Sequence, residues 1–151
     1  MNLLPDDIFR AAGQAQELYH RLVLLVAPAG AGKTAILRSV AEARKLPFLN
    51  VNLEVSSRML DLTGRQRAIR AGKVLREIVD GTQGSPVLLD NIEILFDQSL
   101  KQDPLRLLKD VARSRTVVAS WNGTMDDRGL TYAQPDHPEY QHYPPSEIDF
   151  L

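Results

Sequence analysis

Short apolar runs alternate with longer amphipathic stretches along most of this chain. Apolar runs of three to six residues, typical of buried strands, are followed by stretches in which apolar residues recur every three or four positions, as on one face of a helix. Such alternation predicts an α/β fold with a parallel sheet and helices on both faces, joined by right-handed crossovers. The expected strands are Leu22–Ala27, Phe48–Leu53, Val87–Asp90 and Thr116–Trp121.

Helices are expected before, between and after these strands. Asp103 precedes Pro104, and proline is favoured at the first position of a helix. Pro47 disfavours helical backbone at the residue before it, so the first core helix should stop there. The expected helices lie within residues 1–20 and at Thr34–Arg44, Val55–Leu62, Arg65–Asp80 and Pro104–Arg113.

Residues 129–151 differ from the rest of the chain in composition. This segment contains four prolines and four acids, but no lysine or arginine. We expect a short fifth strand at Tyr140–Tyr143 and otherwise an extended, Pro-rich tail that packs by its aromatic residues or is partly disordered. The chain, residues 1–151, is thus expected to form a single domain with a mainly parallel five-stranded sheet and no helical lid domain.

Composition narrows the classes of function. A length of 151 residues is enough for one domain with a buried core. The net charge of −1 gives no overall attraction to nucleic acid or membranes, and the absence of cysteine excludes disulfides, thiolate zinc sites and cysteine nucleophiles. The first residues are acidic where a signal peptide would be basic, and the longest apolar run is too short to span a bilayer. A cytoplasmic location is therefore expected.

The segment after the first strand fits the Walker A pattern G-x-x-x-x-G-K-[ST], with Ala27 in place of the first glycine. Gly30 and Gly32 allow successive N–H groups to face one concavity, to which the following helix adds its positive dipole end. Lys33 can then reach the β- and γ-phosphates of a nucleotide, and the Thr34 hydroxyl can ligate Mg²⁺. The expected nucleotide-binding residues are Ala29, Gly30, Ala31, Gly32, Lys33, Thr34 and Ala35.

A second motif completes the expected metal site. Asp90 ends an apolar strand, as does the Walker B aspartate that lies beside the metal. Downstream of a phosphate-binding loop, this pattern indicates a magnesium site formed by Thr34 and Asp90. ATP is preferred to GTP as the nucleotide, because the chain lacks an Asn-Lys-x-Asp guanine-recognition motif.

Hydrolysis of ATP needs a group that polarises the attacking water. Asn91 follows Asp90 and can orient a water but cannot accept its proton. Two carboxylates could accept it: Glu54, at the expected end of the second strand, and Glu93, which fits a surface charge on a helix better than a catalytic role. We favour Glu54, because a strand end is held rigidly, although a solvated carboxylate at a helix start explains it equally well. Asn122, at the expected end of the fourth strand, fits either a sensor of the γ-phosphate or an Asn-Gly turn.

Basic residues suggest two further contacts. Arg67, Arg70 and Lys73 recur every third position and share one side of their expected helix. They contact the phosphates of DNA, contact the acidic surface of a partner, or form an ordinary solvated helix face. Three other residues are candidates for an arginine finger, acting in cis or from another copy, or are plain surface residues: Arg113, Arg115 and Arg128.

Three segments carry a resemblance to known families: the loop APAGAGKT (Ala27–Thr34), FLNVNLEVSSRML (Phe48–Leu60) and LLDNIEILF (Leu88–Phe96). Through them the chain resembles the AAA-like branch of P-loop ATPases and, more narrowly, the BrxF family of small P-loop proteins from type 3 BREX (bacteriophage exclusion) systems. The resemblance implies a three-layer P-loop NTPase core. It also implies a role in antiphage defence beside larger subunits, including a DNA methyltransferase and other ATPases. We further expect the chain to form a homo-oligomer.

Two departures from the AAA-like pattern affect the expected activity. Asn91 stands where a glutamate is usual, which argues against fast hydrolysis. Without a lid, any arginine that completes the site must come from the core, another copy or a partner. Three hypotheses follow: a weak or assembly-dependent Mg-ATPase, a non-hydrolysing ATP-dependent switch, and a DNA-contacting accessory subunit.

Overall fold

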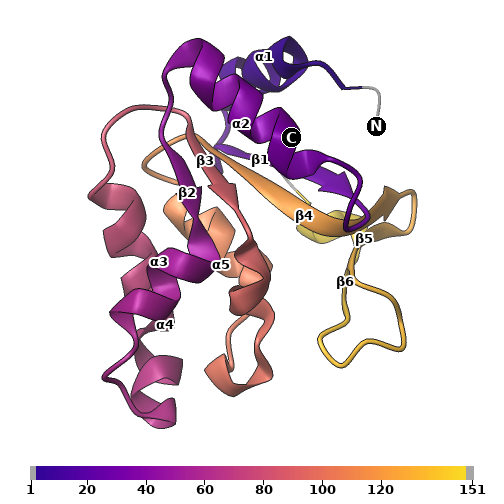
Figure 1. The fold of residues 1–151 in the computed structure, drawn as a ribbon. Coiled ribbons are helices and arrows are strands. Elements are labelled where there is room, and N and C mark those ends of the chain that lie inside the picture. Colours follow the sequence, from indigo (N-terminus) through magenta and orange to yellow (C-terminus); the bar gives the residue numbers. More distant parts are fainter. Residues whose placement is uncertain (1–2, 149–151) are drawn as a thin grey trace.

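The computed structural model describes residues 3–148, which form an α/β fold around one open, mixed sheet (Figure 1). No helix in this part of the chain is long and apolar enough to cross a membrane. The elements, in chain order, are α1 (Pro5–Ala15), β1 (Leu22–Ala27), α2 (Lys33–Arg44), β2 (Phe48–Asn50), α3 (Val51–Arg58), α4 (Gly64–Asp80), β3 (Val87–Asp90), η1 (Ile92–Phe96), η2 (Gln98–Leu100), α5 (Pro104–Val111), β4 (Val117–Asp126), β5 (Gly129–Tyr132), β6 (Gln141–Tyr143) and η3 (Pro145–Glu147).

The sheet has a parallel part and an antiparallel part. The first half of β4 pairs in parallel with β1 on one side and with β3 on the other, and β2 pairs in parallel with β3. The parallel pairing of β4 ends at Asn122, and from Gly123 onward β4 pairs with β5 in antiparallel register, followed by β6. The hairpin arm formed in this way extends away from the parallel strands (Figure 1). The sheet of the described chain therefore has six strands, so the predicted number of five is wrong. The pairings among β1, β2, β3 and β4 are parallel, as predicted.

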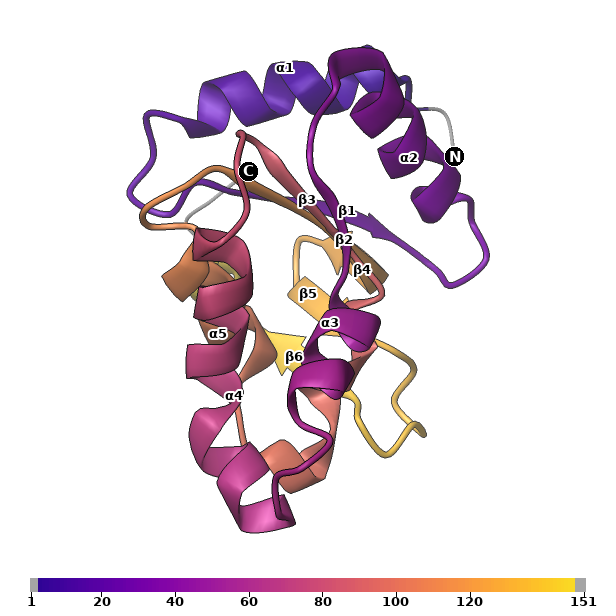
Figure 2. The same ribbon diagram turned by 60° about the vertical axis from the view of Figure 1, so that its left-hand side comes forward.

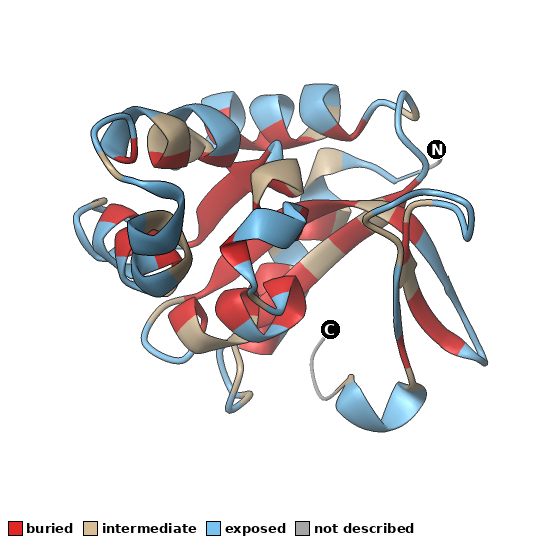
Figure 3. Ribbon diagram, turned by 90° about the horizontal axis from the view of Figure 1, so that it is seen from below, coloured by how far each residue is buried: buried red, intermediate tan, exposed pale blue. Residues whose placement is uncertain are grey.

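Helices cover both faces of the parallel strands, with α1 and α2 on one face and α3, α4 and α5 on the other (Figures 1 and 2). Successive residues of the central strands point to opposite faces, as the pleat requires. Leu88 and Val118 belong to the apolar cluster under α1 and α2, whereas Leu89 and Ala119 belong to the cluster on the other face. Figure 3 shows the result, with buried strands between helices whose outward faces are exposed.

The predicted bounds are confirmed for β1 and β3, and within one or two residues for α2, α4 and α5. These elements have strong local signals. Asp103 caps α5 by accepting a hydrogen bond from the Arg106 N–H, and Thr63 and Gln66 form a reciprocal capping box at the start of α4. At these elements the capping residues and the pattern of buried residues favour the same structure. This agreement explains why the sequence predicted their bounds well.

The second strand is three residues long, so the second half of the predicted strand Phe48–Leu53 is wrong. The chain enters α3 at Val51 because the Asn50 side chain accepts a hydrogen bond (3.0 Å) from the main-chain N–H three residues further on. Val51 and Val55 are four positions apart and both buried, which is a helical spacing. Glu54 consequently lies in the first turn of a helix and not at the end of a strand.

The fourth strand also differs from its prediction, since it runs through Asn122 and Gly123 to Asp126. A Cβ atom at Gly123 would lie 1.8 Å from the main-chain oxygen of Thr131, so glycine permits the close approach of β5 at this point. The Asn-Gly pair is therefore part of a strand and not a turn.

Aromatic packing fixes the hairpin arm against the rest of the fold. The Tyr132 ring stacks on Phe96 of η1 with centroids 3.4 Å apart, and Trp121 meets both rings edge-on. The predicted packing of the C-terminal segment by its aromatics is confirmed, as is the strand at Tyr140–Tyr143, which appears as β6. The strand β5 was not predicted. Residues 149–151 of the predicted tail lie outside the described part of the chain.

Candidate functional site

The loop between β1 and α2, residues 28–32, contains two glycines in a left-handed backbone conformation. Gly30 and Gly32 adopt φ angles of +82° and +98°, the left-handed region that favours glycine. A Cβ atom at either position would meet nothing within 4 Å, so conformation and not crowding requires these glycines. Gly32 is also the N-cap of α2, whose first N–H groups are unpaired within the helix and carry its positive dipole end. The loop thus presents a polar, positively polarised concavity.

Lys33 is buried beneath this loop, with only 6% of its surface exposed. Its Nζ donates hydrogen bonds of 2.8 Å to the main-chain oxygens of Ala27 and Pro28. Burial lowers the pKa of Lys33 below its ordinary value, and this desolvation outweighs the opposing attraction of Glu93 and Asp90. An anion in the loop would give this ammonium group a stronger, charged acceptor than the two carbonyls.

Three side chains from separate elements meet at the start of α2. The Asp90 carboxylate, 4% exposed at the end of β3, accepts hydrogen bonds of 2.7 Å from the Thr34 hydroxyl at Oδ2 and from the Ser120 hydroxyl at Oδ1. Thr34 and Asp90 therefore lie together, as the sequence predicted. Ser120 was not predicted, although a lone hydroxyl residue within the apolar run of β4 was a usable signal.

The chemistry of this cluster fits a magnesium ion that also binds phosphate. A hydroxyl and a carboxylate are the hard oxygen ligands that Mg²⁺ prefers. Within residues 3–148, no group of three or more His, Cys, Asp or Glu side chains could enclose a metal ion. Mg²⁺ usually takes one or two protein ligands and completes its shell with water and phosphate oxygens, so Thr34 and Asp90 suffice for such a site.

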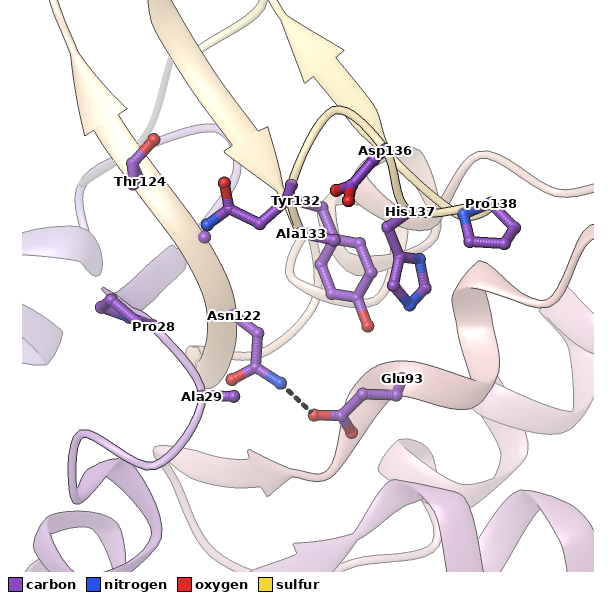
Figure 4. Close-up of a pocket in the computed structure, with 12 residues that line it drawn as sticks. Pro28, Ala29, Glu93, Asn122, Thr124, Tyr132, Ala133, Asp136, His137 and Pro138 are labelled. Atoms are coloured by element: carbon purple, nitrogen blue, oxygen red, sulfur yellow. Dashed lines mark hydrogen bonds between the residues drawn. The ribbon is translucent and has the colours of Figure 1, made fainter.

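Glu93 and Asn122 form the opposite border of the same site. The Asn122 Nδ2 donates a short hydrogen bond of 2.6 Å to Glu93 Oε1 (Figure 4). Glu93 faces the site because Ile92, Leu95 and Phe96, its neighbours in η1, are buried in the core. Within the described chain, Glu93 Oε2 accepts no hydrogen bond. Glu93 is thus a positioned carboxylate with one oxygen available.

The other two predicted catalytic residues have different surroundings. Asn91 has a left-handed backbone (φ +50°), and its main-chain oxygen accepts a hydrogen bond of 2.9 Å from the Asn52 N–H. Asn91 is among the residues that border the site. Glu54 instead forms an ion pair of 2.6 Å with Arg58 on α3 and does not line the site. The reason for favouring Glu54, a rigid position at a strand end, is therefore absent.

The cavity enclosed by these groups, here called the loop cavity, has a volume of about 560 Å³. Of the predicted nucleotide-binding residues, all except Ala31 line it, and so does Arg38, which was not predicted. Its lining comprises Ala29, Gly30, Gly32, Lys33, Thr34, Ala35, Arg38, Asp90, Asn91, Glu93, Ser120 and Asn122.

A second cavity of about 560 Å³, here called the hairpin cavity, adjoins the first and shares Ala29, Glu93 and Asn122 with it. Figure 4 shows side chains of the hairpin arm facing the Glu93–Asn122 pair across this space. These residues were not predicted as functional. Its lining comprises Pro28, Ala29, Glu93, Asn122, Gly123, Thr124, Tyr132, Ala133, Gln134, Asp136, His137 and Pro138.

The proposed DNA-binding residues lie on α4, but they are not equally available. Arg67 is half-buried, and its Nε donates a hydrogen bond of 3.0 Å to the main-chain oxygen of Leu62 in the α3–α4 connection. Lys73 lies 3.9 Å from the Glu77 carboxylate, whereas Arg70 is exposed. Arg67 thus has a structural role in the turn.

None of the three arginine-finger candidates lines the loop cavity. Arg115 donates hydrogen bonds to the main-chain oxygens of Val79 and Thr82, where it caps the end of α4. The Arg113 guanidinium lies 4.9 Å from the centre of the Tyr19 ring. Arg128 is in the exposed turn between β4 and β5.

Comparison with known protein families and with curated proteins found no match to this chain.

Proposed function

We propose that the chain is a P-loop protein that binds ATP with Mg²⁺ in the loop cavity. One observation carries the proposal: the hydrogen bond between Thr34 and Asp90, 56 positions apart in sequence, lies beside the buried Lys33 at the start of α2. This is the juxtaposition that a shared site for magnesium and phosphate requires. In this proposal the parallel strands and their helices are a three-layer P-loop NTPase core.

The chain's own residues would act as follows. The N–H groups of the loop and of the first turn of α2 bind phosphate oxygens, and the Lys33 ammonium exchanges its two carbonyl acceptors for the β- and γ-phosphates. Thr34 and Asp90 would hold Mg²⁺, which would supply positive charge beside the phosphates. Ser120 holds the Asp90 carboxylate in place by its own hydrogen bond.

We assign the role of proton acceptor to Glu93 and not to Glu54. Glu93 borders the loop cavity and has an oxygen available, while Asn122 fixes the orientation of its carboxylate. Among the described residues Arg38 is the one arginine that lines this cavity, and it is exposed. A cation contributed by another copy or a partner would stabilise the transferring phosphate further, so the ATPase is proposed to be weak alone and stronger in an assembly.

The biological setting of the proposal comes from the resemblance to the BrxF family. It supports a cytoplasmic, homo-oligomeric protein that acts with other proteins of a BREX-like antiphage defence complex. DNA contact through Arg67, Arg70 and Lys73 is the weaker alternative, because Arg67 is engaged in the α3–α4 turn.

A second candidate function is an ATP-dependent switch without hydrolysis. Lys33, Thr34 and Asp90 are hydrogen-bonded to protein groups in the structure, so nucleotide and metal must replace these bonds when they bind. Such an exchange would shift the loop relative to β3, which a partner could detect. Turnover distinguishes the two functions, since the switch binds ATP without consuming it.

Calorimetric titration of ATP with and without Mg²⁺ tests the proposal. The wild-type chain should bind ATP more tightly with Mg²⁺, and Asp90→Asn should lose this dependence because it removes the charged metal ligand. Asp97→Asn, which changes an exposed acid at the start of η2, is the matched control and should behave as wild type. Equal ATP affinity with and without Mg²⁺ in the wild-type chain would refute the shared site. ATP turnover at rising protein concentration then separates the ATPase from the switch.

A further inference from the structure

The hairpin cavity is much larger than a water molecule needs. Its volume is about 560 Å³, whereas one water occupies about 30 Å³ in the liquid. Pockets for organic ligands typically measure about 300–1,000 Å³. A site built for hydrolysis alone needs room for one water beside Glu93, so this cavity offers space for an organic molecule.

The position of the cavity places such a molecule next to the proposed phosphate site. The two cavities meet at Ala29, Glu93 and Asn122, so a group bound in the hairpin cavity can face both the Glu93 carboxylate and the loop. In Figure 4 the Tyr132 hydroxyl and the His137 ring point into the space opposite Glu93. Polar groups thus converge at one end of the cavity.

The walls select for charge and shape. No lysine or arginine lines the cavity within the described chain, while the carboxylates of Glu93 and Asp136 do. Pro28, Ala133 and Pro138 supply apolar surface. Such a lining suits a neutral or cationic molecule with an apolar part and disfavours an anion, which would meet two carboxylates without a counter-charge.

Two of the lining groups are hydrogen-bond donors. Burial, reinforced by the nearby charges of Glu93 and Glu139, raises the pKa of Tyr132 well above its ordinary value, so its hydroxyl keeps its proton. The Nδ1 of His137 accepts a hydrogen bond of 3.0 Å from the Glu139 N–H, which leaves the proton of the neutral ring on Nε2. Both donors can orient the oxygen atoms of a bound molecule.

We propose that the hairpin cavity binds an organic phosphoryl acceptor, a neutral or cationic small molecule with a hydroxyl group. This inference rests on the proposed ATP site. The hydroxyl oxygen forms a bond to the γ-phosphorus of ATP while the bond from that phosphorus to the bridging oxygen breaks. The electron pair of the broken bond leaves with ADP, and Glu93 takes the hydroxyl proton. Water is the competing acceptor at the same carboxylate.

Three small probes of nearly equal size test the charge preference: ethanolamine (cationic), ethylene glycol (neutral) and glycolate (anionic). Each is supplied at the same high concentration and constant ionic strength with MgATP. The products, organic phosphate ester and inorganic phosphate, are separated by ³¹P NMR. The ratio of phosphate ester to inorganic phosphate should exceed the molar ratio of probe hydroxyl groups to water. The ester yield should be highest with ethanolamine, lower with ethylene glycol and lowest with glycolate. Saturation-transfer NMR without nucleotide should show the same order of binding.

Gln134→Phe is the variant that tests the location. Gln134 is exposed, lines the hairpin cavity and makes no side-chain hydrogen bond in the described chain, so its replacement fills the cavity without breaking a contact. This variant should retain ATP affinity but lose probe binding and ester formation. Gln141→Phe, the same substitution on β6 outside the cavity, should retain both.

The outcomes separate the two proposals. If ATP binds with Mg²⁺ but ester yields follow only the molar shares of the acceptors, the acceptor pocket is refuted and the ATP site stands. Equal binding of glycolate and ethanolamine, or probe binding that survives Gln134→Phe, also refutes it. If ATP does not bind, the ATP site fails first, and the acceptor proposal fails with it.

Discussion

The loop cavity and the hairpin cavity have the same volume and share three residues, yet they differ in how their walls are built. In the loop cavity the charged and polar groups bind one another: Lys33 binds two carbonyls, and Asp90 binds two hydroxyls. In the hairpin cavity an aromatic and proline-lined wall faces one carboxylate–amide pair, Glu93 and Asn122.

This difference follows from the topology. Parallel strands end at the same edge of a sheet. The residues at the ends of β1 and β3 therefore lie close together, independently of the conformation of the connecting loops. The hairpin wall instead depends on the stacking of Tyr132 against Phe96 and on the close approach of β5 to Gly123. The first cavity is thus suited to charge and the second to the body of an organic molecule. The two should respond differently to substitution.

Lys33→Ala should have the largest effect, a loss of ATP affinity of about a thousandfold. The ammonium would make two charge-assisted contacts to phosphate oxygens, each worth about 1.5–3 kcal/mol. Calorimetric titration measures the affinity, with circular dichroism to check the fold. Arg44→Ala removes a cation from the same helix that stacks on Phe9 outside the loop cavity, and it should bind ATP normally. Undiminished affinity in folded Lys33→Ala would remove the ATP site from this loop.

The sequence predicted the loop cavity far better than the hairpin cavity. Gly30, Gly32, Lys33 and Thr34 form a contiguous motif whose spacing has one physical purpose, and Asp90 ends a short apolar strand. The hairpin wall has no such motif. Two of its strands, β5 and β6, are only four and three residues long. Their position is set by packing between residues far apart in sequence, such as Phe96 and Tyr132.

Gly123→Ala should destabilise the fold by about 3 kcal/mol, because its Cβ atom would lie 1.8 Å from the Thr131 oxygen and β5 must shift. Gly30→Ala, in the open loop, should cost about 1–2 kcal/mol, from the left-handed backbone alone. Urea unfolding of both variants gives the two free energies. The reverse order would show that the approach of β5 to β4 is looser than the structure indicates.

Glu93→Gln should lower ATP turnover by about a hundredfold while retaining ATP affinity, since a positioned general base contributes roughly a hundredfold or more. Glu54→Gln breaks only the ion pair with Arg58 on α3 and should leave turnover unchanged. Steady-state kinetics of the two variants decide between the carboxylates. A selective loss of turnover in Glu54→Gln would restore the assignment favoured by the sequence.

The misplacement of Glu54 has a specific cause. The run Phe48–Leu53 alternates apolar and polar residues as a strand does, but Asn50 is also a good N-cap, and Val51 and Val55 are spaced as in a helix. The signals for the two structures overlap at residues 50–53. Burial of Val51 and Val55 decided in favour of the helix, and this tertiary effect is not visible in the sequence alone.

Tyr143→Phe should have the smallest effect, and its sign should depend on pH. Tyr143 on β6 donates a hydrogen bond of 2.8 Å to Asp103, and burial, with this bond and the Asp103 charge, raises its pKa well above the ordinary 10.0. The hydroxyl therefore stays neutral in the folded chain but ionises near pH 10 in the unfolded one. Its contribution to the free energy of unfolding is full below pH 10 and declines as the pH rises further.

At pH 7 Tyr143→Phe should lower the free energy of unfolding by about 1 kcal/mol, because the hydrogen bond is lost. Above pH 10 the free energy of unfolding should fall with pH in both proteins, but less steeply in the variant. The two slopes should differ by about 1.4 kcal/mol per pH unit, because the variant lacks one ionisable proton. Urea unfolding followed by the fluorescence of Trp121, the chain's one tryptophan, gives both values.

Tyr132→Phe is the control, because the Tyr132 hydroxyl makes no hydrogen bond within the described residues. This variant should show the shallower slope above pH 10 without the loss of stability at pH 7. Parallel slopes in wild type and both variants would mean that these hydroxyls ionise equally in the folded and unfolded chains.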